Sequence, residues 1–263
     1  MGETVSGHVD IHAHVLPGID DGPETIEASV AMARAAAAAG TVVLAATPHL
    51  HANFPNVDVE QIATGVEQVQ AAIDAERIAL RLVPAAEASL VWALEASDEH
   101  LRLATYGQRG TDLLIETPND VSMIEQLIYQ VRLRGVRVTL AHPERSETFQ
   151  RAPERLARLH EQGILLQVNA SGLLRAHSPG RKLIEHLVRN ELADVMASDG
   201  HRATEWRPVS ALADGAAALT ALVGPARAQW MVCDAPGAIV AGQPLPPAPG
   251  IERPRRGLFA RRR

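Results

Sequence analysis

The segment HVDIHAHVLPGIDDG, residues 8–22, joins an apolar, strand-like run to two histidines and two neighbouring aspartates. Residues i and i+2 of a strand point to the same face, so His12 and His14 are expected to lie side by side. Neutral imidazoles with carboxylates nearby are typical of a divalent metal site. A His-x-His pair also occurs by chance on surfaces and in cores, so the rest of the chain must distinguish the two interpretations.

The composition favours a globular α/β protein with an aliphatic core. Of the 263 residues, 46% are hydrophobic but only 3% are aromatic, and the net charge of −6 argues against a nucleic-acid partner. Cys233 is the single cysteine, which excludes an internal disulfide and a cysteine-based zinc cluster. The N-terminus lacks the pattern of a secretory signal, and no stretch resembles a membrane span, so a cytoplasmic location is expected.

Short apolar runs alternate with helix-like segments along the chain. Seven runs are predicted to form strands, at residues 9–14, 41–49, 80–87, 111–117, 136–144, 164–171 and 193–201. Helices are predicted over residues 25–40, 57–77, 120–134, 152–162, 180–191 and 208–223. Strands that alternate with helices at this spacing indicate β–α units and a parallel sheet.

Each predicted strand ends at a residue that can bind or react. In chain order the ends carry His12 and His14, His49, Glu87, Glu116, His142, Asn169, and Asp199 with His201. Ordinary turn formation would favour Gly, Asn, Ser and Asp at these positions, not repeated His and Glu. In a closed β/α barrel the carboxyl ends of all strands form one rim that holds the active site, whereas an open sheet gathers residues only near its switch point. A closed barrel is therefore predicted.

Several common hydrolase chemistries are excluded by their missing motifs. Ile239 stands six residues after Cys233, so the Cys-x5-Arg loop of cysteine-dependent phosphatases is absent. There is no G-x-S-x-G elbow, phosphate-binding loop or H-E-x-x-H helix. Histidines and carboxylates without a nucleophilic side chain indicate metal-activated water.

Six motifs in order carry a family resemblance: DIHAHVLPGIDDG, ATPHLH, AAEASL, LLIET, LAHPER and ASDGH. Over residues 8–202 the chain resembles the polymerase and histidinol phosphatase (PHP) superfamily, most closely its capsule-type CpsB/CapC branch of manganese-dependent protein tyrosine phosphatases. The resemblance implies a distorted (βα)7, TIM-like barrel with a metal centre at the carboxyl rim. It also implies a phosphomonoesterase that acts on a phosphotyrosine-containing kinase of capsule or exopolysaccharide synthesis.

The resemblance further implies two to three divalent ions, Mn above all, with Fe or Zn as alternatives. Its ligand set gives one ion to His12, His14, Glu87 and Asp199, a second to Glu87, Glu116 and His142, and a third to Asp21, His49 and His201. Asp199 and His201 are also expected to be catalytic.

Arg145, in the HPER motif, is expected to bind a phosphate oxygen and take part in catalysis. A surface ion pair with Glu144 or Glu147 is the alternative for this arginine. His51 is a second expected substrate contact, with a solvated loop histidine as the alternative. Asp20 has no ligand role in the resemblance and is interpreted as a turn residue.

Two other activities stay open from the sequence. A histidinol-phosphate phosphatase would use the same ligands, although the local motifs LPGIDDG and AHPER and the short predicted rim loops favour the tyrosine phosphatase. An amidohydrolase also begins with His-x-His on a first strand, but it does not need the third set of Asp21, His49 and His201.

The chain is expected to divide into a phosphatase barrel, residues 1–235, and a disordered tail, residues 236–263. The tail is rich in Pro and Gly, and its last eleven residues contain six arginines. Such a segment suits peripheral contact with an acidic membrane surface or an acidic partner, or it is simply solvated.

Overall fold

The computed structural model describes residues 7–119 and 121–252, and its strands are all parallel. One sheet has the order β1 (His8–Ala13), β2 (Thr41–Ala46), β4 (Arg81–Pro84). The other has the order β3 (His49–Leu50), β5 (Glu87–Ala88), β6 (Asp112–Glu116), β7 (Arg137–Ala141), β8 (Leu165–Asn169), β9 (Val195–Ala197). The predicted parallel α/β architecture is confirmed.

The predicted closed barrel is not shown by this strand pairing. The second and third predicted strands are each split into two short strands, and the later halves, β3 and β5, pair in the other sheet. Pro48 and Pro84 lie at or beside these breaks, where proline cannot donate a ladder hydrogen bond. At the opposite edge, the end of β1 meets the segment after β9 through an isolated bridge between Ala13 and Gly200.

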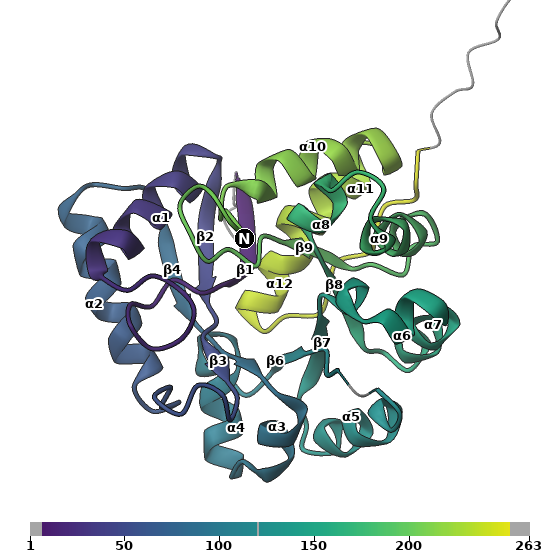
Figure 1. Cartoon of the computed structure of the whole chain (residues 1–263), viewed down its shortest axis with the longest axis horizontal. Helices are drawn as coiled ribbons and strands as arrows, with labels where there is room; N and C mark the ends of the chain where they lie inside the picture. Colours follow the sequence, from purple (N-terminus) through teal and green to yellow (C-terminus); the bar gives the residue numbers. More distant parts are fainter. Residues whose placement is uncertain (1–6, 120, 253–263) are drawn as a thin grey trace, which may run out of the picture.

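Helices surround the strands on the outside (Figure 1). Six of them confirm the predicted helices, with shorter bounds: α1 (Ile26–Ala38), α2 (Ile62–Ala75), α5 (Ile124–Arg132), α7 (Glu154–Glu161), α9 (Pro179–Arg189) and α10 (Ala211–Val223). Shorter helices were not predicted: α3 (Leu90–Glu95), α4 (Asp98–Ala104), α6 (Glu147–Arg151), α8 (Ala170–Leu174), α11 (Pro225–Gln229) and α12 (Ala235–Ala241).

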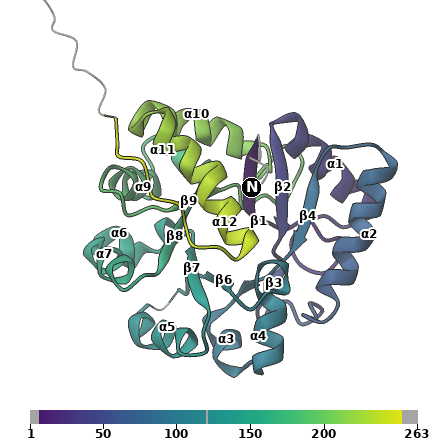
Figure 2. The same cartoon turned by 180° about the vertical axis from the view of Figure 1, so that it is seen from behind.

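The segment after residue 235 differs from the expected disordered tail. Residues 235–241 form α12, which lies across the strands in the view from behind (Figure 2), and its Ile239 and Val240 are buried. The chain then continues along the protein, where Pro246 accepts a hydrogen bond from Trp230 and Glu252 donates one to Val223. Residues 235–241 are thus packed in the structure where disorder was expected from residue 236 on, and the division into a barrel and a tail stays a prediction. The arginine-rich residues 253–263, and any membrane contact through them, lie outside the described residues.

The core is aliphatic, as the composition predicts, and it fills the space within and around the sheets. Ile11, Leu44, Leu114 and Leu166 from four different strands are fully buried. Tyr106 is one of the few buried aromatic residues, and its hydroxyl donates to the carbonyl of Ile11 over 2.9 Å. None of the described helices is long and apolar enough to span a bilayer.

Candidate metal centre

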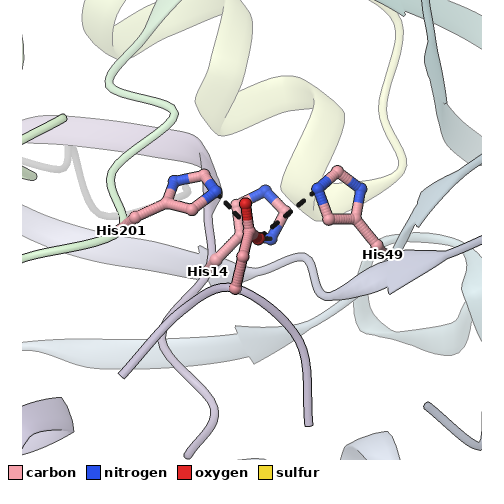
Figure 3. Close-up of side chains that lie close together, drawn as sticks. His14, His49 and His201 are labelled. Atoms are coloured by element: carbon pink, nitrogen blue, oxygen red, sulfur yellow. Dashed lines mark ion pairs between the residues drawn. The ribbon is translucent and has the colours of Figure 1, made fainter. Parts of the chain in front are cut away.

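The predicted ligands come together at the carboxyl ends of the strands. They are His12 on β1, His14 and Asp21 after it, His49 on β3, Glu87 on β5, Glu116 ending β6, His142 after β7, and Asp199 and His201 after β9. Figure 3 shows His14, His49 and His201 with their rings directed toward one another around a carboxylate. The parallel strand order explains this convergence, since equivalent strand ends share one edge.

Unusual backbone conformations aim two of these residues inward. His142 and Asp199 have backbone φ angles of +37° and +53°, in the left-handed region that residues other than glycine rarely adopt. Gly200 allows the close approach that follows, because a Cβ there would lie 2.6 Å from Cα of Val209. His14 N donates to the Gly200 carbonyl over 2.8 Å, which ties the end of β1 to this turn.

Glu87 is the centre of the cluster. Its Oε2 lies 3.2 Å from His12 Nε2, 3.3 Å from His14 Nε2 and 3.1 Å from His49 Nδ1. Its Oε1 accepts from His142 Nε2 over 2.8 Å. Burial alone would raise the pKa of Glu87, but the nearby charges of His12 and His142 outweigh it and hold the pKa well below its ordinary value. Glu87 is therefore an anionic carboxylate shared among imidazoles.

Among the described residues, three groups of donor atoms have the spacing needed to hold metal ions. They are His12, His14 and Glu87; His49, Glu87 and Glu116; and His14, Asp21, His49 and His201, with all ligand atoms of a group within 4.8 Å of one another. Asp199 adds to the first group, with Oδ1 3.5 Å from His12 Nε2. The predicted residues are thus brought together, while the partition among individual ions stays a prediction.

Two residues sit differently from the partition that the resemblance implies. His49 Nδ1 lies 3.9 Å from Glu116 Oε2, and His49 Nε2 lies 3.6 Å from Asp21 Oδ1. His49 therefore belongs both to the group with Glu116 and to the group with Asp21. His142 reaches Glu87 but is not in the group that contains Glu116. The second ion could therefore take His49 in place of His142.

Unpaired donor atoms show that the cluster fits cations. Several buried side-chain atoms at the centre lack a hydrogen-bond partner, namely Oδ1 of Asp21, Nδ1 of His49, Oε2 of Glu87, Oδ1 of Asp199 and Nε2 of His201. Buried polar atoms are rarely left unpaired in folded proteins. Imidazole and carboxylate ligands together suit Mn, Fe or Zn, so these residues fit the metals that the resemblance implies.

The histidines differ in charge before any metal binds. Burial would lower the pKa of His14, but its hydrogen bond to Asp20 and the neighbouring carboxylate of Glu87 raise that pKa to about 10. Burial and the charge of His14 lower the pKa of His201 to about 4, so His201 is neutral near pH 7. A metal needs neutral imidazole nitrogen, and so its binding must displace the proton of His14.

Asp20 has a role at the centre that the sequence analysis missed. Its Oδ2 accepts from His14 Nδ1 over 2.8 Å and from the backbone of His49 over 3.2 Å. Its Oδ1 accepts from Gly22 N over 2.9 Å, which confirms the predicted turn. A carboxylate on the second nitrogen of a ligating histidine fixes the orientation of the ring. The sequence signal for this role is that Asp20 directly precedes the predicted metal ligand Asp21.

Two arginines reach the cluster, only one of which was predicted. Arg145 lies with Nη1 3.6 Å from Asp199 Oδ2, and its side chain is 55% exposed, so it faces both the cluster and solvent. Arg207 forms an ion pair with the same carboxylate and is almost buried. No strand-end pattern marks Arg207, because it lies in an irregular loop after β9. Its proximity to Asp199 depends on tertiary structure alone.

A cleft of about 490 Å³ opens beside the cluster. Glu116 and His51 lie along it, together with apolar residues such as Phe54, Leu90 and Trp92. The Phe54 ring stacks on His49, with centroids 4.8 Å apart, so the apolar lining begins at a metal-site histidine. His51 is outside the three donor groups, and its Nδ1 accepts from Asn53 N.

Comparisons with known proteins agree with this geometry. The family model for capsular polysaccharide synthesis, CpsB/CapC, matches residues 8–241. Tyrosine-protein phosphatase YwqE of Bacillus subtilis is 30% identical over 196 residues, which cover 73% of this chain and 77% of YwqE. Tyrosine-protein phosphatase CpsB of Streptococcus pneumoniae is 24% identical over 202 residues, covering 73% of this chain and 82% of CpsB.

Solved structures give the same result. A crystal structure from work on YwqE of Bacillus subtilis and CpsB of Streptococcus pneumoniae, described as unique metal-dependent tyrosine phosphatases, superposes with a TM-score of 0.79 at 25% identity. The match covers 93% of this chain and all of that one. A β-aspartyl dipeptidase of Fervidobacterium islandicum AW-1 shares only the fold, at 12% identity and a TM-score of 0.57, over 89% of this chain and 75% of that chain. The chain therefore belongs to the CpsB/CapC capsular polysaccharide synthesis family.

Proposed function

We propose that this protein is a metal-dependent phosphomonoesterase that removes phosphate from tyrosine side chains of proteins, built on a distorted β/α barrel. The observation that carries the proposal is the cluster of unpaired donor atoms around Glu87, with Arg145 and Arg207 at its side. The relatives named as tyrosine phosphatases support the substrate. Phosphoryl transfer needs positioned positive charge more than covalent help, and this arrangement supplies it.

The chain's own residues would divide the work as follows. When bound, two to three divalent ions would supply the Lewis-acid charge that activates water and neutralises the phosphate. His12, His14, Asp21, His49, Glu87, Glu116, His142, Asp199 and His201 would hold them. Asp20 keeps the His14 ring oriented through its 2.8 Å hydrogen bond. Arg145 and Arg207 would donate hydrogen bonds to phosphate oxygens once Asp199 binds a metal ion.

The cleft beside Glu116 favours an aromatic phosphate ester. Phe54 and Trp92 form apolar walls next to the cluster, so a phenyl ring can be buried while its phosphate reaches the metals. Phenol has a pKa of ~10, so phenolate is a far better leaving group than an alkoxide and needs less protonation as it leaves. The open cleft also leaves space for the residues that flank a phosphotyrosine, with His51 at its edge.

The proposed partner is a phosphotyrosine-bearing kinase of capsule or exopolysaccharide synthesis, with dephosphorylation in the cytoplasm. The family name supports the link to capsule synthesis, and the names of the relatives support a phosphotyrosine protein as the substrate class. Histidinol phosphate remains the competing substrate, since it would use the same metals. Its imidazole is polar and its leaving group is an alkoxide, so the apolar cleft suits it less well.

Substrate selectivity tests the proposal. With Mn²⁺ supplied, kcat/KM for a phosphotyrosyl peptide should exceed that for histidinol phosphate and for a phosphoseryl peptide by at least about 10-fold, because of the better leaving group and the apolar cleft. Steady-state release of inorganic phosphate measures all three reactions on one preparation. A tenfold advantage for histidinol phosphate would replace the tyrosine assignment with the biosynthetic one.

The Trp92→Ala variant separates the cleft from the chemistry. It should raise KM for the phosphotyrosyl peptide and leave the rate with histidinol phosphate nearly unchanged, since only the aromatic ester uses the apolar wall. Tyr129→Ala is the matched control, because Tyr129 is an exposed aromatic residue of α5, at 58%, and does not line the cleft. Equal losses for both substrates in Trp92→Ala would argue against an aryl site in this cleft.

A further inference from the structure

A chain of buried hydrogen bonds joins two of the predicted metal ligands through two amide side chains. Gln167 Oε1 lies 2.9 Å from His12 Nδ1, and Gln167 Nε2 donates to Asn169 Oδ1 over 2.8 Å. Asn169 Nδ2 in turn donates to Asp199 Oδ2 over 2.6 Å. Gln167 and Asn169 are i and i+2 on β8, so their side chains share one face of the strand.

Only one assignment of donors and acceptors satisfies all four side chains of this hydrogen-bonded row. An ionised carboxylate can only accept, so Asn169 must turn its NH₂ group toward Asp199 and its oxygen toward Gln167. Gln167 must then donate to that oxygen, which leaves its own carbonyl to accept a hydrogen bond from His12 Nδ1. Both amides are buried, Gln167 completely and Asn169 at 5% exposure, so water offers little alternative.

This assignment leaves the metal-facing atom of each ligand free. With Nδ1 of His12 donating to Gln167, Nε2 is the ring atom left to face the metal site, 3.2 Å from Glu87 Oε2. With Oδ2 of Asp199 held by Asn169, its Oδ1 has no hydrogen bond and lies 3.7 Å from His14 Nε2. The Asn169 backbone is itself held, because its N–H donates to Glu144 Oε1 over 3.0 Å.

We propose that Gln167 and Asn169 act as one positioning unit, an amide relay that orients His12 and Asp199 together for the same ion. The proposal rests on the metal centre of the proposed function. The relay couples the two ligands. Loss of Gln167 leaves the His12 ring without its acceptor and Asn169 Oδ1 without its donor, while Asp199 Oδ2 keeps its pair with Arg207. Loss of Asn169 removes the bond to Asp199 and the acceptor of Gln167 Nε2. Outer hydrogen-bond partners of metal ligands affect affinity by about 10–100-fold.

Metal affinity of single and double variants tests the relay. Gln167→Met and Asn169→Ala should each weaken Mn²⁺ binding by about 10–100-fold, and the double variant should be little weaker than the worse single one. Mn²⁺ alone is the probe, titrated against a competing chelator into metal-stripped protein. Gln70→Met is the matched control, since Gln70 is a part-buried glutamine that bonds the backbone of Leu80 and Leu82 away from the centre.

The outcomes distinguish the relay from the metal centre itself. Thermal unfolding of the metal-free variants shows how far each substitution only destabilises the fold, and Asn169→Ala keeps the test open should Gln167→Met not fold. Wild-type affinity in either folded single variant, or losses that add fully in the double variant, would overturn the relay. Absence of Mn²⁺ binding by the wild-type protein would overturn the metal centre as well.

Discussion

Replacing Glu87 with glutamine is expected to reduce kcat/KM for a phosphotyrosyl peptide by more than about 1,000-fold, because it removes the buried negative charge that four histidines of the cluster share. Glu87 contacts His12, His14 and His49 through Oε2 and His142 through Oε1. The amide is nearly isosteric, but it is a weak metal ligand and its NH₂ group would face imidazole nitrogens. Metal content should fall together with activity.

Glu125→Gln provides the matched control for this variant. Glu125 is also part of a charged pair, with Arg155, but lies on α5 away from the metal centre. It should retain both metal and activity. A Glu87→Gln protein that keeps its metals and more than about a tenth of wild-type kcat/KM would contradict the role of Glu87 as the shared ligand.

Replacing Arg145 with alanine should lower kcat/KM by about 100-fold or more while the metal content stays unchanged. Its guanidinium lies 3.6 Å from Asp199 and is half exposed, so it can reach a phosphate that enters from solvent. Because Arg145 is not a ligand, the loss should come from weaker stabilisation of phosphoryl charge. Steady-state kinetics and elemental analysis of the same sample measure both quantities.

Arg151→Ala serves as the control for the arginine variant. Arg151 pairs with Glu147 on α6 and its side chain is 76% exposed, so its removal should change neither rate nor metal content. A loss of metal in Arg145→Ala would mean that the arginine maintains the cluster. A change in kcat/KM of less than about threefold would mean that the phosphate is held by other groups, Arg207 first.

The predictable part of the site followed from the strand ends. Because parallel strands end at a common edge, His49, Glu87, Glu116 and His142 could be placed together from their positions after apolar runs. That inference depends only on the order of apolar runs and helical segments along the sequence. It remains valid although two of the predicted strands are split. The splitting itself depends on how the later halves pair across the structure, which local pattern does not contain.

Residues that act through tertiary contacts were not predictable in the same way. Arg207 lies in an irregular loop and meets Asp199 only because that loop folds back. The relay of Gln167 and Asn169 depends on how close β8 lies to β1 and to the segment after β9. The spacing of residues along the sequence does not reveal that distance. In α12, Pro236 occupies the first turn, where its missing N–H costs little, so a Pro/Gly-rich composition concealed a packed helix.

Metal content measured beside activity on one gently purified sample tests the central claim most directly. The account predicts about two to three transition-metal ions per chain, loss of phosphotyrosine hydrolysis when a chelator removes them, and recovery when Mn²⁺ is restored. Less than about one ion per chain, together with activity that survives the chelator, would contradict a metal-dependent phosphatase.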